Sequence, residues 1–192
     1  HWMVHSFPTR RSSDLLNRSP IADAGESKSA CAGEQVSFDG TSSVSEAGTA
    51  LSYRWSFGDG ETATGSRVNH VYNKGGKHNV ILTVDDQRGT DCSTASDSII
   101  VDINSRPAVE LADVQERCLG KAVNLVASAS DPDGDKLAYN WDFGDGGTAQ
   151  GSAHVTHTYA RGGNYTVSVT VDDGKNSPCR SEERRVGKEC TI

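Results

Sequence analysis

The sequence predicts an all-β protein made of two tandem β-sandwiches, and three observations support this. Residues 68–92 return as residues 155–179, an offset of 87 residues, with 11 of 25 positions identical. A period of this size corresponds to a whole small domain rather than to a solenoid repeat. Apolar and polar residues alternate over short runs, as in half-buried antiparallel strands. Glycine-rich turns separate these runs, and no amphipathic helical stretch stands out.

The alternation defines matching strands in the two repeats. The third strand of each repeat has one apolar face, formed by Leu51, Tyr53, Trp55 and Phe57 or by Leu137, Tyr139, Trp141 and Phe143. A longer strand follows at residues 78–85 and 165–172, and an earlier strand contains Val36 or Val123. Residues 99–103 form the closing strand of the first repeat. Short strands at this spacing over about 85 residues are typical of a two-sheet sandwich.

The two ends of the chain stand outside the repeat pattern. One DNA string, TCTTTCCCTACACGACGCTCTTCCGATCT, encodes residues 6–15, and its reverse complement encodes residues 180–188. The string resembles a sequencing-library adapter, and the alternative is a genuine inverted repeat in the gene. Adapter-derived segments are excluded from fold reasoning. We therefore expect residues 1–16 and 180–192 to be non-native flanks, so that the second repeat ends near Cys179 and lacks its native last strand.

The charge balance argues against several classes of partner. The chain carries a net charge of −7, and each flank contributes +1, so the remainder is more acidic still. An acidic surface disfavours nucleic acid and anionic membranes as partners. No apolar run approaches the roughly 18 residues that a membrane-spanning helix needs, so membrane insertion is not expected.

The repeated motifs resemble those of the PKD (polycystic kidney disease) domain family. Each repeat contains Trp-x-Phe-Gly-Asp-Gly, at residues 55–60 and 141–146, followed by His-x-Tyr at residues 70–72 and 157–159. The resemblance implies an immunoglobulin-like β-sandwich in each repeat, with one domain at residues 17–104 and a truncated one at residues 105–179. It also implies an extracellular or cell-surface protein of bacterial type.

The same resemblance favours a non-catalytic role. The leading hypothesis is a spacer or interaction module of a larger secreted or surface protein, with neighbouring domains and an unidentified protein or polysaccharide as partners. The alternative is an auxiliary module of a secreted hydrolase that binds polysaccharide or collagen. No Ser-His-Asp, paired-carboxylate or zinc arrangement emerges from the sequence, so we expect no enzyme activity. We interpret Trp55 and Trp141 as core residues rather than as ligand platforms.

Four cysteines lie outside the flanks. Cys31 and Cys92 are 61 residues apart, and so are Cys118 and Cys179. Equal spacing suggests one disulfide in each repeat, Cys31–Cys92 and Cys118–Cys179, with Cys190 unpaired. The alternative is four buried or free thiols, because a bridge needs Cα atoms within about 7 Å of each other.

The sharpest candidate site is the sequence Asp131-Pro132-Asp133-Gly134-Asp135. Carboxylates on one side of a turn suit a hard cation such as Ca²⁺. The PKD modules of clostridial-type collagenases are similar here, and the resemblance implies Asn104, Asp131, Asp133 and Asp172 as calcium ligands, with a main-chain carbonyl near Ser105. The alternative is a solvated turn. The first repeat departs from the pattern, since Val44 and Glu46 stand at the positions of Asp131 and Asp133.

Overall fold

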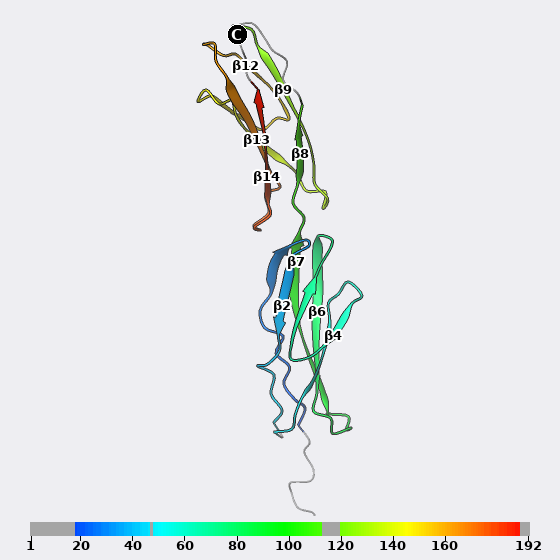
Figure 1. The fold of residues 1–192 in the computed structure, drawn as a ribbon. Coiled ribbons are helices and arrows are strands. Elements are labelled where there is room, and N and C mark those ends of the chain that lie inside the picture. The colour runs from blue at the N-terminus through cyan, green and yellow to red at the C-terminus, as the bar shows by residue number, and fades with distance from the viewer. Residues whose placement is uncertain (1–17, 47, 113–119, 189–192) are drawn as a thin grey trace, which may run out of the picture. The chain divides into compact units, whose positions relative to one another are not determined.

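The computed structural model describes residues 18–46, 48–112 and 120–188, and this part of the chain contains fourteen strands and no helix (Figure 1). The predicted all-β class is confirmed. The expected flank at residues 1–16 lies outside the described residues, as do Asn17, Cys118 and Cys190.

The first repeat contains seven strands in two sheets. They are β1 (Lys28–Cys31), β2 (Gln35–Asp39), β3 (Ser52–Ser56), β4 (Thr62–Thr64), β5 (Arg67–Val71), β6 (Gly76–Asp85) and β7 (Thr94–Asn104). One sheet has the order β1-β7-β6-β3-β4, and β2 pairs with β5 in the other. Strand β1 runs parallel to the end of β7, from Lys28 opposite Val101 to Cys31 opposite Asn104.

The second repeat also folds into two sheets. Its strands are β8 (Ala108–Leu111), β9 (Val123–Ser130), β10 (Ala138–Asp142), β11 (Thr148–Gln150), β12 (His154–His157), β13 (Tyr165–Asp172) and β14 (Ser181–Lys188). The sheet orders are β11-β10-β13-β14 and β12-β9-β8. The pairing of β10 with β13 places Trp141 opposite Val169, as the pairing of β3 with β6 places Trp55 opposite Leu82.

Each sandwich is filled by the apolar faces that the sequence predicts. In the first repeat, Phe38 of β2 packs against Trp55 and Phe57, with ring centroids 5.5 and 5.3 Å apart. In the second, Leu125 of β9 joins Trp141 and Val169 in one buried cluster. Both tryptophans are fully buried and donate their indole N–H to a main-chain oxygen, Trp55 to Gly65 and Trp141 to Ser152. Their interpretation as core residues is confirmed.

The closing strand of the second repeat comes from the segment that we expected to be a flank. We expected the second sandwich to lack its native last strand, and Ser181–Lys188, within the expected flank, forms β14 and pairs antiparallel with β13 over eight residue pairs, from Asp172 opposite Ser181 to Tyr165 opposite Lys188. Without β14, one edge of β13 would present a row of unpaired main-chain groups, which readily accept an adjacent segment. Residues 181–188 therefore complete this sheet.

The described chain divides into two compact units whose limits differ from those of the repeats. One contains residues 18–26, 37–69 and 79–100 of the first repeat. The other contains residues 27–36 and 70–78 of the first repeat together with the described residues from 101 onward. The second unit therefore holds β1, the end of β7 and the whole of the second repeat, and the candidate site lies within it.

Candidate functional site

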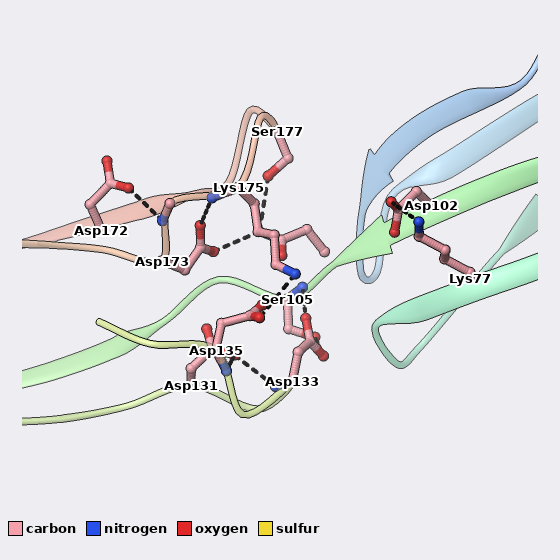
Figure 2. A network of polar contacts seen from close by, with 12 residues as sticks. Lys77, Asp102, Ser105, Asp131, Asp133, Asp135, Asp172, Asp173, Lys175 and Ser177 are labelled. Atoms are coloured by element: carbon pink, nitrogen blue, oxygen red, sulfur yellow. Dashed lines mark hydrogen bonds and ion pairs between the residues drawn. The ribbon is translucent and has the colours of Figure 1, made fainter. Parts of the chain in front are cut away.

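The acidic turn between β9 and β10 is built by its own main chain. The Oδ1 atom of Asp131 accepts hydrogen bonds from the main-chain N–H groups of Asp133 and Asp135, at 2.8 and 3.2 Å. This arrangement turns the chain back on itself and brings the three carboxylates together. One oxygen of each lies within 4.8 Å of one oxygen of the other two (Figure 2).

The residue after β7 fixes the middle carboxylate. Ser105 donates its main-chain N–H to Asp133 Oδ2 at 2.6 Å and its hydroxyl to Asp133 Oδ1 at 2.9 Å. Ser105 is buried, whereas Asp133 is exposed, so both bonds are partly buried. They hold the turn against the segment that connects β7 with β8.

Asn104 lies at the end of β7 and is buried as well. Its side-chain amide donates to Asp173 Oδ2 at 2.8 Å and to the hydroxyl of Ser177 at 2.9 Å. The predicted ligand Asp172 is not brought to this group. Its Oδ1 accepts from the N–H of Gly174 at 2.7 Å, and its Oδ2 lies 3.2 Å from Arg180 Nε.

The neighbouring residue, Asp173, was missed by the sequence analysis, although a signal for it existed. Residues alternate between the two faces of a strand. Val167, Val169 and Val171 are buried, so the same parity carries Asp173 inward, and it is 6% exposed. Asp135 was part of the quoted motif but was left out of the predicted ligand set, and the structure places it with Asp131 and Asp133.

One basic side chain reaches the acidic group. Lys175 Nζ lies 2.9 Å from Asp135 Oδ1, and this hydrogen bond, followed by the charge of the carboxylate, raises the pKa of Lys175. The second oxygens of Asp131 and Asp135 are buried and have no hydrogen-bond partner among the described residues. A cavity of about 370 Å³ adjoins the group and is lined in part by Asn104, Asp133 and Lys175.

The donor set fits a hard cation. The turn brings the carboxylates of Asp131, Asp133 and Asp135 together, and one oxygen each of Asp131 and Asp135 has no hydrogen-bond partner among the described residues, which is chemistry that suits Ca²⁺. The ammonium group of Lys175 compensates part of the negative charge of these carboxylates, so a bound cation would compete with it. The residues that would hold the ion are Asp131, Asp133 and Asp135.

The disulfide pairing differs from the prediction. Cys31 of β1 is bonded to Cys179 in the loop between β13 and β14, with Cα atoms 5.9 Å apart, and Cys92 is a free, exposed thiol. Both predicted pairs, Cys31–Cys92 and Cys118–Cys179, are therefore wrong, although Cys118 itself lies outside the described residues. Equal spacing could not distinguish the possibilities, because in a tandem repeat every cysteine recurs at the same offset whichever partner it takes.

Outside the acidic turn, the carboxylate of Asp145 lies in the Gly-Asp-Gly turn of the second repeat. Asp145 Oδ2 is 2.7 Å from His157 Nε2, and the histidine ring stacks on Phe143 with centroids 4.1 Å apart. The hydrogen bond from His157 lowers the pKa of Asp145. A histidine sandwiched in this way and bonded to a turn aspartate has a structural role, as its contacts are with its own turn and core.

Comparison with known proteins identifies the family. The PKD domain family matches residues 17–101 and again residues 104–187, so the chain belongs to the PKD family and contains two of its domains. It is 38% identical over 88 residues to collagenase ColA of Clostridium perfringens, and this match covers 45% of the chain and 8% of the collagenase. It is 31% identical over 145 residues to the pre-pro-metalloprotease PrtV of Vibrio cholerae, covering 76% of the chain and 15% of that protein.

The matched region is a small part of each relative. The chain spans well under a fifth of these curated relatives. None of the described residues belongs to a helix long and apolar enough to cross a membrane.

Proposed function

We propose that the chain is a non-catalytic spacer or interaction module of a larger secreted or surface-anchored bacterial protein. The observation that carries this proposal is that two PKD domains account for residues 17–101 and 104–187, while the matched region is a small part of each protease relative. The module acts by holding neighbouring domains apart, and no chemical step is assigned to it.

The alternative is an auxiliary module that binds collagen or polysaccharide for a secreted hydrolase. Such modules use exposed aromatic rings that stack on the ligand. Both described tryptophans are buried, and the large apolar side chains that are most exposed are aliphatic, namely Ile21, Val44, Val71, Ile81, Ile100 and Val126. This distribution favours the spacer over the substrate-binding module.

Co-sedimentation separates the two functions. The full chain is mixed with insoluble collagen and, separately, with insoluble polysaccharides such as cellulose and chitin. The spacer function predicts that the protein stays in the supernatant with every material. Saturable enrichment in a pellet, competed by the soluble form of the same polymer, would support the substrate-binding module instead.

We further propose that the second repeat binds Ca²⁺ through the turn at Asp131, Asp133 and Asp135. The partnerless oxygens of Asp131 and Asp135 and the cluster of carboxylates support this proposal. The set implied by the family resemblance, Asn104, Asp131, Asp133 and Asp172, remains a prediction. Because Asn104 ends β7 and Ser105 follows it, while the turn follows β9, a bound ion would stiffen the second compact unit.

Thermal unfolding with calcium and with chelator tests this site. A ligand that binds only the folded state stabilises it by RT ln(1 + [L]/Kd), about 2.7 kcal/mol at a hundredfold excess over Kd. Asp131→Ala should abolish the gain, whereas Glu46→Ala, at the matching position of the first repeat, should preserve it. Lys175→Gln should tighten binding because it removes the competing ammonium. Equal midpoints with calcium and with chelator would refute the site.

A variant of Asp172 tests whether this residue is a calcium ligand, as the family resemblance implies. Asp172→Asn keeps the size of the side chain and removes the negative charge that faces Arg180. If the geometry in Figure 2 defines the site, this variant retains the calcium gain. Loss of the gain in Asp172→Asn, with the gain kept in Asp135→Asn, would favour the set implied by the resemblance.

A further inference from the structure

A turn of the first repeat lies directly against the acidic turn. Gly75 lies between β5 and β6, and a Cβ atom on it would overlap all three atoms of the Asp133 carboxylate. The carboxylate could give way only by leaving Ser105, which donates two hydrogen bonds to it (Figure 2). Position 75 therefore accepts only glycine if Asp133 is to keep its place in the group of three carboxylates.

The requirement for glycine at position 75 is steric. The φ of Gly75 is not in the left-handed region, so its backbone conformation would suit alanine. Gly76 is the reverse case, with a φ of +137° and nothing within 4 Å of a Cβ atom. In the corresponding turn of the second repeat, a Cβ on Gly163 would lie at an ordinary 3.6 Å from the ring of Tyr165. Among these three glycines, only Gly75 is needed for the room that its missing side chain leaves.

A hydrogen bond and a disulfide connect this turn with the second repeat. Tyr72, three residues before Gly75, accepts a hydrogen bond at its carbonyl from the main-chain N–H of Gly33, at 2.7 Å. Cys31, two residues before Gly33, is bonded to Cys179. All of these residues belong to the compact unit that contains the second repeat. The disulfide therefore helps to hold the turn at Gly75 beside the acidic turn.

The other end of the disulfide lies in a loop with its own anchor. The amide of Asn104 donates to the hydroxyl of Ser177, two residues before Cys179. Lys175, in the same loop, is paired with Asp135, but the lysine side chain is 51% exposed. Exposed ion pairs contribute little to stability. Displacement of Lys175 from Asp135 by a cation would thus leave Cys179 in place.

We infer that the Cys31–Cys179 disulfide regulates the proposed calcium site through Gly75 and Asp133. With the disulfide formed, the turn at Gly75 and the two bonds from Ser105 confine the Asp133 carboxylate to one position in the acidic turn. With the disulfide reduced, the turn at Gly75 is free to move away, and calcium binding must also order the carboxylate, which weakens the binding. This inference rests on the proposed calcium site.

The regulation is reciprocal, because two coupled sites change each other's equilibrium constants by the same factor. Reduction is thiol–disulfide exchange, in which two glutathione thiols give up two protons and two electrons, become glutathione disulfide, and leave the two cysteines as thiols. Cys31 and Cys179 are 6% and 1% exposed, so a glutathione thiolate reaches them only when the surrounding chain opens. Bound calcium should oppose this opening.

Two equilibrium measurements on the full chain test the inference. Calorimetry gives the calcium Kd of the oxidised protein and of the double variant Cys31→Ser, Cys179→Ser, at a temperature where circular dichroism shows both to be folded. Alkylation and mass spectrometry give the fraction of the Cys31–Cys179 bridge at fixed glutathione ratios, with calcium and with chelator. We expect the Kd to be about tenfold higher in the double variant, and calcium to raise the equilibrium constant of the disulfide by about the same factor.

Gly75→Ala tests the route without removing the disulfide. The added methyl group drives the Asp133 carboxylate away from Ser105, so oxidised Gly75→Ala should bind calcium about as weakly as the double variant. Calcium should then leave the disulfide equilibrium of Gly75→Ala nearly unchanged. Gly163→Ala is the matched control, because its methyl group makes only an ordinary contact, and it should keep the calcium Kd of the oxidised wild type.

The outcomes separate this inference from the calcium site itself. Absence of calcium binding to the oxidised wild type would refute the site and the inference together. An equal Kd in the wild type, the double variant and Gly75→Ala would leave the site in place and refute the regulation. If Gly75→Ala bound calcium as Gly163→Ala does, the coupling would not pass through Gly75 and the inference would be wrong. This last comparison decides the matter even if the double variant does not fold.

Discussion

Most described aspartates in this protein shape turns by accepting a main-chain N–H two residues further on. Examples of these bonds join Asp23 to Gly25, Asp39 to Thr41, Asp85 to Gln87, Asp145 to Gly147 and Asp172 to Gly174. Side-chain oxygens that bond nearby main chain are typical of such turns. The group at Asp131 differs because three carboxylates converge there, and this is why a cation is proposed at that turn alone.

Asp39 gives a test of the turn bonds at the level of one residue. The side-chain hydrogen bond from Thr41, its main-chain N–H and Arg67 lower the pKa of Asp39 from 3.8 to about 2. Thr41→Val removes the largest of these contributions, so we expect the pKa of Asp39 to rise toward 3.8, measured by NMR titration. Ser42→Ala, at the next exposed position, serves as the control and should leave the pKa near 2.

The sign of the linked pH effect follows from the lowered pKa. A carboxyl whose pKa is lower in the folded state stabilises the fold above its ordinary pKa of 3.8, and this contribution is lost as the pH falls toward 2. The acid limb of the stability curve of Thr41→Val should therefore be shallower between these values. An unchanged acid limb together with an unchanged pKa would contradict the role of Thr41.

At the level of elements, the Trp-x-Phe-Gly-Asp-Gly motif is a strand that ends in a tight turn. Trp141 lies in β10, and Phe143 then donates its main-chain N–H to the carbonyl of Gly147 at 3.0 Å, as Phe57 does to Glu61. The first glycine has a φ of +79° in the second repeat and +81° in the first, which side chains rarely adopt. The motif therefore has a structural role in both repeats.

Two alanine substitutions in this turn distinguish the cost of a positive φ from the cost of steric overlap between a Cβ atom and the main chain. Gly144 and Gly146 both have positive φ, but only a Cβ at Gly144 would meet main-chain atoms, 2.5 Å from the carbonyl oxygen of Thr166. Gly146→Ala should lower the free energy of unfolding by about 1–2 kcal/mol. Gly144→Ala should lower it by about 1–3 kcal/mol more. Urea unfolding measures both, and equal losses would show that the overlap is relieved without cost.

At the level of the whole molecule, the Cys31–Cys179 disulfide joins two residues that are far apart in the sequence. It joins β1 to the loop before β14 across 148 residues, and both half-cystines are buried. Both lie in the second compact unit, where Asn104 and Ser105 make their polar contacts with the second repeat. Within this unit, a disulfide and a set of hydrogen bonds therefore link Cys31, Asn104 and Ser105 to residues of the second repeat.

Removing this bond tests its contribution. Closing a loop of 148 residues lowers the entropy of the unfolded chain enough to stabilise the fold by about 5 kcal/mol. The double variant Cys31→Ser, Cys179→Ser should therefore lose about this much in urea unfolding under oxidising conditions. Cys92→Ser, at the exposed free thiol, should lose almost nothing. An equal loss in both variants would contradict the pairing.

The sequence by itself determined the fold class, the twofold repeat and the core. Alternation along a strand and recurrence at 87 residues are local or periodic signals, and they identified Trp55, Trp141 and their partners correctly. It could not determine which cysteines meet, because a repeat makes pairing within and between repeats look alike. Nor did it show that Asp173 rather than Asp172 contacts Asn104, or that residues 181–188 complete the sheet. Those outcomes depend on which groups far apart in sequence lie side by side, and only the tertiary structure brings those groups together.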